Sequence, residues 1–247
     1  MAPWPFPLWI AHRGAGKLAP ENTLAAFRLG ASHGHTAFEC DVKLSADGVP
    51  FLLHDDTLER TSNGQGVAGD CQWSELSRLD AGSWHSVAFA GEPIASFDAI
   101  AAFCAAGAYM LDLELKPSPG ADVETGRVVG QAVRQLSRGT PVVLSSFKPQ
   151  ALMGARESAP EVPRALLLDS LWPSCMEMAA SLDCVAIITN HTLMDSALLA
   201  QIHAAGRRAL VYTVNDAPRA RELIDLGVDG IVTDAVDVFS PRATLPR

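Results

Sequence analysis

The chain alternates between short apolar runs rich in β-branched residues and longer segments in which apolar and polar positions are mixed. Runs of the first kind predict buried β-strands. The eight expected strands are Leu8–Ala11, Ala37–Leu44, Tyr109–Leu115, Pro141–Phe147, Arg164–Leu168, Cys184–Thr189, Ala209–Val214 and Gly230–Thr233. The mixed segments have helical character and lie at Thr23–His33, Phe97–Ala106, Val123–Leu136, Pro149–Glu157, Met194–Ala204 and Pro218–Leu226.

Alternating strands and helices predict a parallel sheet covered by helices. Eight units in 247 residues leave about 31 residues for each, close to the roughly 30 that a strand, its helix and their connections take. The weakest unit is the fifth, whose helix would lie within Pro173–Ser181 and make barely two turns. An open doubly wound sheet is an alternative, although no G-x-G-x-x-G motif follows the first strand. Eight units favour an α/β fold of the closed TIM (β/α)8 barrel type, somewhat distorted.

One stretch breaks the regular spacing. Residues Asp56–Pro93 are rich in glycine and contain no obvious strand followed by a helix. Loops this long inside a compact domain are usually functional. We therefore expect a small, loop-rich insertion after the second strand.

The composition narrows the classes of protein. The 48% of apolar residues predict a sizeable core, and 28 Asp and Glu against 19 Lys and Arg give a net charge of −9. This acidic excess argues against a surface that coats nucleic acid or anionic membranes. The five cysteines are scattered and form no C-x-x-C pair, so we expect neither a disulfide framework nor a thiolate zinc site.

The beginning of the chain does not resemble a targeting signal. Its first ten residues are apolar but interrupted by prolines, and the first basic residue, Arg13, follows them instead of preceding them. No apolar run approaches the roughly 18 residues that a membrane span requires. Together with the scattered cysteines, these features predict a cytoplasmic protein.

Charged and histidine side chains gather at the carboxyl ends of the first three predicted strands. They are His12 and Arg13 after the first strand, Glu39 and Asp41 on the second, His54 shortly after it, and Glu114 and Lys116 on the third. In a parallel barrel these strand ends surround one mouth, where the active sites of TIM barrels lie. We expect these side chains to form one site.

The spacing within each strand points to a metal ion. Glu39 and Asp41 are two positions apart and face the same side of their strand, as do Glu114 and Lys116. Burying a carboxylate costs several kcal/mol unless a cation or another partner compensates it. Three carboxylates without a soft ligand favour a hard cation, Mg²⁺ or Ca²⁺. Two histidines beside that cation suggest proton transfer.

Simpler interpretations were weighed for several residues. Glu114 and Lys116 could form a surface ion pair worth about 0–1 kcal/mol, although their apolar strand argues against it. Five histidines are interpreted as structural: His33, His35, His85, His191 and His203. Three charged residues that follow His54 are interpreted as ordinary loop charges: Asp56, Glu59 and Arg60.

Nine short motifs follow one another along the chain. They are His-Arg-Gly (12–14), Pro-Glu-Asn-Thr (20–23), Glu-Cys-Asp-Val (39–42), Asp-Gly-Val-Pro (47–50), His-Asp-Asp-Thr-Leu-Glu-Arg-Thr (54–61), Leu-Glu-Leu-Lys (113–116), Ser-Phe (146–147), Val-Tyr-Thr-Val-Asn (211–215) and Gly-Val-Asp-Gly-Ile-Val-Thr-Asp (227–234). In this order they resemble the motifs of the bacterial glycerophosphodiester phosphodiesterases. One His-Arg-Gly would be a weak signal, whereas nine blocks in the family's order are specific.

The resemblance implies a fold and a set of site residues. The fold is one distorted TIM-barrel domain over residues 1–247 with an inserted subdomain at about 57–94, where the irregular stretch lies. Positions that match Glu39, Asp41 and Glu114 bind the divalent cation in the family, and those that match His12 and His54 form the acid/base pair. The remaining matches are two phosphate contacts, Arg13 and Lys116, and a site residue near the metal, Glu21.

The resemblance also implies an activity, the hydrolysis of glycerophosphodiesters to sn-glycerol 3-phosphate and an alcohol by a cytosolic enzyme. The substrate is then a small molecule, and we expect no nucleic-acid partner and no stable membrane association. A monomer and a homodimer both stay open. Two positions depart from the family: Tyr212 replaces its usual Trp, which leaves the contacts to the alcohol open, and Val236 replaces its usual proline.

Two other functions compete with this one. Relatives of the family act as lysophospholipases D, which need an apolar groove near the mouth, and Trp84, Phe89 and Phe97 could supply one. Packing of the insertion is the favoured role for these three aromatic residues. A non-catalytic barrel that binds phosphate esters or cations is the second alternative, but it would have no need of paired histidines beside a metal.

Overall fold

Parallel strands close into a barrel in the computed structural model, which describes residues 4–136 and 140–241. Eight parallel strands form the ring in this part of the chain: β1 (Trp9–Ala11), β2 (Ala37–Leu44), β4 (Met110–Leu115), β5 (Val142–Ser146), β6 (Arg164–Leu168), β7 (Ala186–Asn190), β8 (Arg208–Tyr212) and β9 (Gly230–Thr233). The ring is closed because β1 pairs with β9 on one side and with β2 on the other. The TIM barrel is confirmed, and the alternative of an open sheet is wrong.

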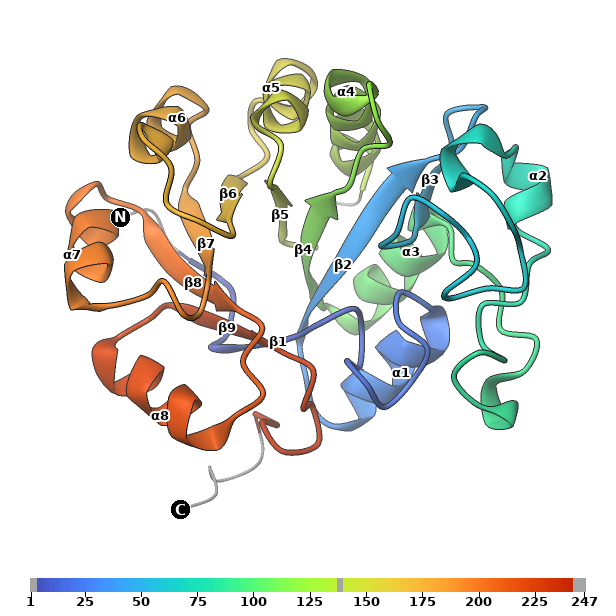
Figure 1. The fold of residues 1–247 in the computed structure, drawn as a ribbon, viewed down its shortest axis with the longest axis horizontal. Helices are drawn as coiled ribbons and strands as arrows, with labels where there is room; N and C mark the ends of the chain where they lie inside the picture. Colours follow the sequence, from blue (N-terminus) through green and yellow to red (C-terminus); the bar gives the residue numbers. More distant parts are fainter. Residues whose placement is uncertain (1–3, 137–139, 242–247) are drawn as a thin grey trace.

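Helices cover the outside of the barrel (Figure 1). They are α1 (Leu24–Ser32), α3 (Phe97–Gly107), α4 (Asp122–Arg134), α5 (Pro149–Ser158), α6 (Cys175–Ser181), α7 (Ser196–Ala204) and α8 (Ala217–Leu226). The helix of the fifth unit, α6, has only seven residues, as its weak sequence pattern predicted. Among the described residues, no helix is both long and apolar enough to cross a membrane.

The barrel strands present alternate residues to opposite sides of the wall. Along β2, Phe38, Cys40 and Val42 belong to the large apolar core between barrel and helices. Glu39 and Asp41 lie at the intervening positions and face the interior, which has an apolar floor. The floor includes Ile10, Val143, Leu167, Ile188, Leu210 and Val232. The carboxylates therefore stand above a closed apolar layer at the carboxyl end of the barrel.

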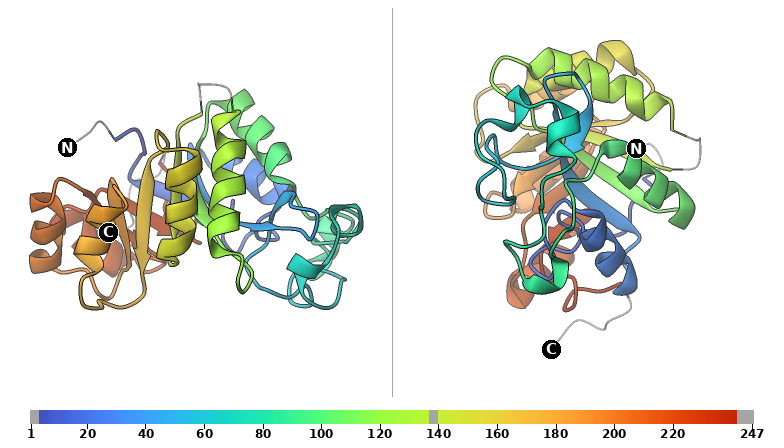
Figure 2. Two further views of the ribbon diagram at one scale, coloured as in Figure 1. Left: turned by 90° about the horizontal axis from the view of Figure 1, so that it is seen from above. Right: turned by 90° about the vertical axis from the view of Figure 1, so that its right-hand side faces the viewer.

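The segment 57–94 lies outside the ring of strands (Figure 2). It is preceded by β3 (Pro50–Leu52), a strand that the sequence pattern did not predict and that pairs antiparallel with β2. The segment contains the short helices η1 (Ala68–Asp70), α2 (Trp73–Leu76) and η2 (Val87–Phe89). Apolar side chains of the segment pack with Phe51 and Leu53, from β3 and the residue after it, in a small cluster separate from the main core; those of the segment are Leu58, Ala68, Leu76, Ala81 and Ile94.

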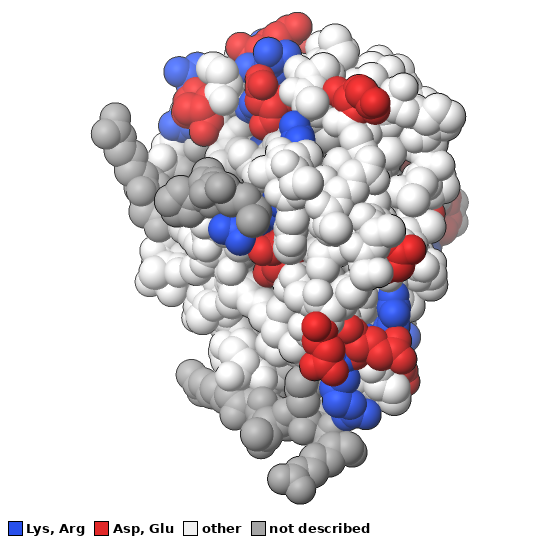
Figure 3. All heavy atoms as spheres, turned by 90° about the vertical axis from the view of Figure 1, so that its left-hand side faces the viewer, with Lys and Arg blue, Asp and Glu red and all other residues white. Residues whose placement is uncertain are grey.

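Acidic and basic side chains lie beside one another on the face of the molecule that Figure 3 shows. Three ion pairs made by arginines of the outer helices have this character: Arg134 with Glu161, Arg156 with Asp183, and Arg127 with Glu124. These pairs do not form a basic patch of the kind that nucleic acid requires.

The contact between α4 and α5 depends on glycine. A Cβ atom at position 126 would lie 1.8 Å from the carbonyl oxygen of Ala151, whereas one at position 130 would lie 2.4 Å from the Ser158 hydroxyl, which can rotate. We expect Gly126→Ala to lower the free energy of unfolding by roughly 1–3 kcal/mol because the helices must move apart. Gly130→Ala is the matched control, since it gains the same helix propensity. Equal urea midpoints for the two variants would contradict this prediction.

Candidate active site

The first histidine of the site, His12, directly follows β1. Its Nδ1 lies 2.6 Å from Asp234 Oδ1 and its Nε2 lies 3.6 Å from Glu39 Oε2. Asp234 follows the neighbouring strand β9 and is held by Asn215, whose amide donates to it and accepts from its backbone N–H, both at 2.8 Å. Burial alone would raise the pKa of Asp234, but the hydrogen bond with His12 lowers it. The ionised carboxylate accepts the Nδ1 proton and leaves Nε2 free toward the interior.

The second histidine, His54, forms a similar pair with the residue that follows it. Its Nδ1 lies 2.7 Å from Asp55 Oδ1. Burial lowers the pKa of His54, so the imidazole is neutral near pH 7. Hydrogen bonds from Arg60 hold the pKa of Asp55 well below its usual range. Both histidines of the site thus have a carboxylate on Nδ1.

Glu39, Asp41 and Glu114 form a buried acidic cluster between the two histidines. Each residue offers a carboxylate oxygen, and these oxygens all lie within 4.8 Å of one another. The strand register causes this arrangement, because Asp41 on β2 is paired with Glu114 on β4. Burial and repulsion by Asp41 raise the pKa of Glu39 well above its usual value and that of Glu114 to about 7. The cluster therefore favours binding either protons or a metal cation.

The surroundings of Asp41 fit a metal ion. Burial alone would raise the pKa of this carboxyl, but Arg13 and Lys116 lower it, so the group is ionised. Its Oδ2 accepts a hydrogen bond of 2.7 Å from the Asn22 amide. Its Oδ1 is buried without a hydrogen bond, and Lys116 Nζ lies 3.5 Å from it. An all-oxygen donor set with an unsatisfied oxygen is suited to Mg²⁺ or Ca²⁺.

Two cationic side chains adjoin the acidic cluster. Arg13 has a left-handed backbone, with φ of 50°, and its backbone N–H donates to Glu39 at 3.1 Å. Its guanidinium lies between Glu21, at 2.7 Å, and Asp41, at 3.3 Å. Lys116 directly follows β4, lines the cavity described below and donates to Glu114 at 2.9 Å. Both cations can contact a phosphate that enters the mouth.

A cavity of about 190 Å³ opens among these groups. It is lined by His12, Arg13, Glu39, His54, Asp112, Glu114, Lys116, Ser145, Phe147, Leu167, Ile188, Tyr212, Thr213 and Val232. A second cavity of about 320 Å³ shares His54, Glu114, Lys116 and Phe147 with the first and extends outward past Lys148. A larger cavity, about 830 Å³, is lined by residues such as Phe6, Val142 and Val185 and contains none of the predicted site residues. The predicted site residues that line a cavity are therefore found in the two smaller, adjoining cavities.

Comparison with known proteins identifies the family of this site. Residues 12–238 match the model of the glycerophosphoryl diester phosphodiesterase family. The chain belongs to this family. It is 36% identical to the Bacillus subtilis protein YhdW over 92% of this chain and 94% of that protein. It is 29% identical to the glycerophosphodiester phosphodiesterase of Caldanaerobacter subterraneus subsp. tengcongensis over 92% and 93%.

A solved structure agrees with this assignment. A phosphodiesterase of Oleispira antarctica, determined in complex with the product sn-glycerol 3-phosphate, superposes with a TM-score of 0.90 and 34% identity. The superposition covers 94% of both chains. The protein is therefore a glycerophosphodiester phosphodiesterase, and the resemblance seen in its motifs is confirmed.

The site residues predicted from the sequence lie together in this phosphodiesterase, except for Glu21. His12, Arg13, Glu39, His54, Glu114 and Lys116 line the first cavity, and Asp41 lies directly beside them in the acidic cluster. Tyr212 also lines it, with its hydroxyl donating to the Leu168 carbonyl at 3.2 Å. Glu21 lies apart from the acidic cluster and pairs with Arg13 and Arg60.

The histidines interpreted as structural lie outside both mouth cavities, as do the three aromatic residues considered for a lipid groove. Phe97 is buried in the main core and Phe89 packs against it. Trp84 is half-exposed, and its indole N–H donates to the Ala81 carbonyl. None of these positions provides an apolar entrance to the site.

Several residues of the site were missed by sequence reasoning. Asp112 lines the cavity and accepts a 2.6 Å hydrogen bond from Ser145, and burial raises its pKa to about 7. It is two positions before Glu114, so the same spacing rule could have found it. Asp234 follows the last strand as His12 follows the first, which is also a usable signal.

The interpretation of Arg60 as an ordinary loop charge is wrong. Its guanidinium binds both Asp55 and Glu21. Asp56 is not an isolated charge either, since it accepts a 2.7 Å hydrogen bond from the fully buried Lys43. Glu59 is exposed, and its carboxylate accepts a hydrogen bond from the backbone N–H of Gly66 within its own loop. A sequence pattern could not distinguish these three charges, because their partners come from other segments.

The raised pKa values of the acidic cluster predict a pH-dependent affinity for cations. At pH 8 Glu114, with its pKa of about 7, is ionised, whereas at pH 6 it carries a proton that must leave before a cation binds. We expect Ca²⁺ or Mg²⁺ to raise the Tm more at pH 8 than at pH 6.

Calorimetry at both pH values measures this effect. Glu114→Gln should reduce the rise in Tm that the cation causes, while Glu157→Gln, an exposed position on α5, serves as the control. An equal rise for the two variants would exclude Glu114 as a ligand.

Proposed function

We propose that this phosphodiesterase hydrolyses glycerophosphodiesters such as glycerophosphocholine and glycerophosphoethanolamine in a metal-dependent reaction. The products are sn-glycerol 3-phosphate and the free alcohol, and His12 and His54 are the acid/base pair. One observation carries the proposal: two histidines, each held by a carboxylate on Nδ1, face one cavity with the acidic cluster between them.

Glu39, Asp41 and Glu114 are the proposed ligands of one divalent cation, Mg²⁺ or Ca²⁺. When bound, such a cation polarises the phosphate and neutralises charge that develops on its oxygens. Arg13 and Lys116 bind the non-bridging oxygens from the same side, and their charges are directed at the phosphate before the reaction begins. The side chains of Arg13 and Lys116 also orient the diester between the histidines.

The proton transfers fall to the two imidazoles. One histidine removes a proton from the nucleophile, either water or the glycerol 2-hydroxyl of the substrate, and the other, protonated on Nε2, donates that proton to the departing alcohol oxygen. Attack by the 2-hydroxyl gives a cyclic phosphate, which a water molecule then opens to sn-glycerol 3-phosphate. Asp234 and Asp55 hold Nδ1 of the two rings and so leave Nε2 for this exchange. The apolar floor under the cavity keeps bulk water away from the interior side.

Two further observations support the proposal. The Oleispira antarctica neighbour binds sn-glycerol 3-phosphate, which is the product expected here. The five cysteines are free thiols, which supports the proposed cytoplasmic location.

Removing either histidine should lower kcat. We expect His12→Ala and His54→Ala to lose roughly 10²–10⁴-fold, the usual effect of losing a general acid or base. Release of sn-glycerol 3-phosphate from glycerophosphocholine, followed with a coupled dehydrogenase, measures this loss. His33→Ala, at the end of α1, is the control. Near-normal turnover in either site variant would refute the assignment.

The metal dependence and the two competing functions are tested with the same assay. Chelation should abolish release, and Mg²⁺ or Ca²⁺ should restore it. Lysophosphatidylcholine should be a poorer substrate than glycerophosphocholine, because Trp84, Phe89 and Phe97, the aromatic residues considered for an acyl-chain groove, line neither of the two mouth cavities. A higher kcat/KM for the lysolipid would favour the lysophospholipase D. Binding of glycerophosphocholine without turnover under every cation would favour the non-catalytic barrel.

A further inference from the structure

The guanidinium of Arg60 joins two loops that are distant in sequence. Its Nε and Nη2 donate to the two carboxylate oxygens of Asp55, at 2.5 and 2.9 Å. Its Nη1 and Nη2 donate to the two oxygens of Glu21, at 2.9 and 2.8 Å. One rigid planar group therefore fixes the orientation of two carboxylates, a task for which arginine is better suited than lysine.

Each of the two carboxylates contacts a different side chain of the site. Asp55 holds Nδ1 of His54 at 2.7 Å, and Glu21 holds the guanidinium of Arg13 at 2.7 Å. Arg60 itself belongs to the segment 57–94, outside the barrel. It lines neither mouth cavity, so it does not touch a substrate bound there.

The two histidine–carboxylate pairs are supported differently. Asp234 is held by Asn215 through two hydrogen bonds, and both residues lie next to barrel strands. Asp55 has only His54 and Arg60 as its described side-chain partners. Without Arg60, the Asp55 carboxylate is free to rotate away from the imidazole.

The contact contributes little to folding. The Arg60 side chain is 44% exposed, and ion pairs at exposed positions add only about 0–1 kcal/mol to stability. Its consequence is therefore geometric, since a catalytic group that is misplaced by about 1 Å can lose roughly 100-fold in rate.

We propose that Arg60 is a positioning residue for His54: the segment 57–94 supplies a guanidinium that locks Asp55 against Glu21 and thereby fixes the imidazole in the active site. This inference rests on the proposed role of His54 in the reaction. It assigns a function to the segment 57–94, which supplies none of the three carboxylates of the acidic cluster.

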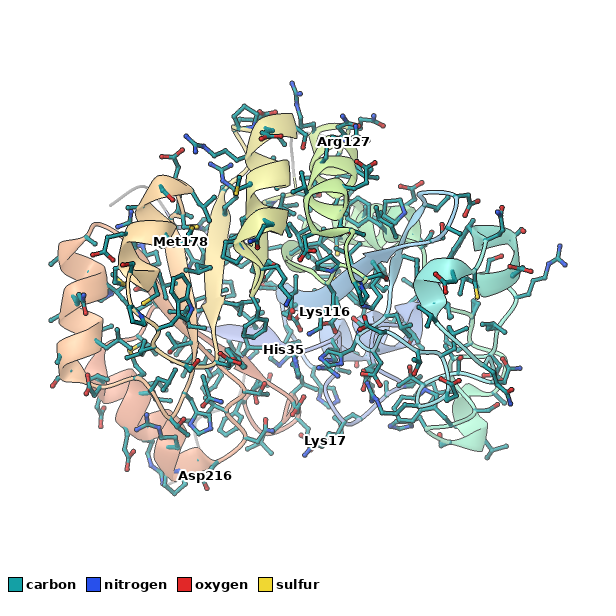
Figure 4. All side chains as sticks on the ribbon, turned by 45° about the horizontal axis from the view of Figure 1, so that its top comes forward. Lys17, His35, Lys116, Arg127, Met178 and Asp216 are labelled. Atoms are coloured by element: carbon teal, nitrogen blue, oxygen red, sulfur yellow. The ribbon has the colours of Figure 1, made fainter. Side chains whose placement is uncertain are left out.

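The first test compares three variants with glycerophosphocholine as substrate, at a saturating concentration of the cation that supports the wild-type enzyme. Arg60→Met should lower kcat roughly 10- to 100-fold, and Arg60→Lys should lose less, because it keeps the charge but cannot bind two carboxylates as a planar fork. Arg127→Met is the matched control: its side chain is also 44% exposed and binds Glu124 through Nε and Nη2. It lies on α4, far from Lys116 (Figure 4), and should stay within about twofold of wild type.

A second test separates positioning from a general structural effect. In the His54→Ala background, Arg60→Met should change kcat by less than about threefold, because the group that it positions is gone. A loss that acts through Glu21 and Arg13, the proposed phosphate contact, should instead appear in KM and be equal in both backgrounds. Arg60→Lys in the same background gives the same information if the methionine variant does not fold. An equal loss in both backgrounds, or a loss no greater than that of Arg127→Met, would overturn the inference.

The proposed function and this inference fail in different ways. A wild-type enzyme without turnover under Mg²⁺ or Ca²⁺ would overturn both. An active wild-type enzyme with an inactive His54→Ala variant but an unaffected Arg60→Met variant would overturn the inference alone.

Discussion

The mutual repulsion of three buried carboxylates is the constraint on which the rest of the site depends. Glu39, Asp41 and Glu114 face one another because alternate positions of two neighbouring parallel strands point into the barrel. Arg13 and Lys116 compensate part of the charge and keep Asp41 ionised. The raised pKa values of the other two carboxyls indicate that this compensation is incomplete. The cluster is consequently an oxygen-rich site that favours the binding of one more cation.

This electrostatic centre is held by elements of different rigidity. The strands fix the carboxylates and, through Asp234 and Asn215, they also fix His12. His54 follows β3, which is not one of the eight strands of the ring. Its partner Asp55 is held by Arg60, a side chain of the segment 57–94. The insertion has its own small apolar cluster, which keeps the backbone around Arg60 in place. The segment 57–94 at the surface thus completes a site that is built mainly on the barrel strands.

Tyr212 is held in the lining of the first mouth cavity by two contacts. The hydroxyl is engaged by the Leu168 carbonyl, and the ring meets Phe147 edge to face with centroids 5.7 Å apart. Lys116 lies 5.8 Å from the centroid of the same Phe147 ring. The tyrosine therefore takes part in an aromatic wall beside the phosphate contacts and does not leave a polar group unpaired in the cavity. The wall keeps its apolar character despite the added hydroxyl.

The sequence by itself determined the eight strands and the three carboxylates of the acidic cluster, because strand alternation and the spacing of Glu39 and Asp41 are local properties of the chain. It favoured the closed barrel over an open sheet, but only the pairing of β1 with both β2 and β9 decided between them. β3 escaped prediction because its three residues acquire their strand character only by pairing with β2. Tertiary structure alone decided the partners of the histidines and of Arg60. His12 and Asp234 are 222 residues apart, and Arg60 and Glu21 are 39 apart. Their proximity follows from the closure of the barrel and from the packing of the insertion against it, neither of which is encoded in a local pattern.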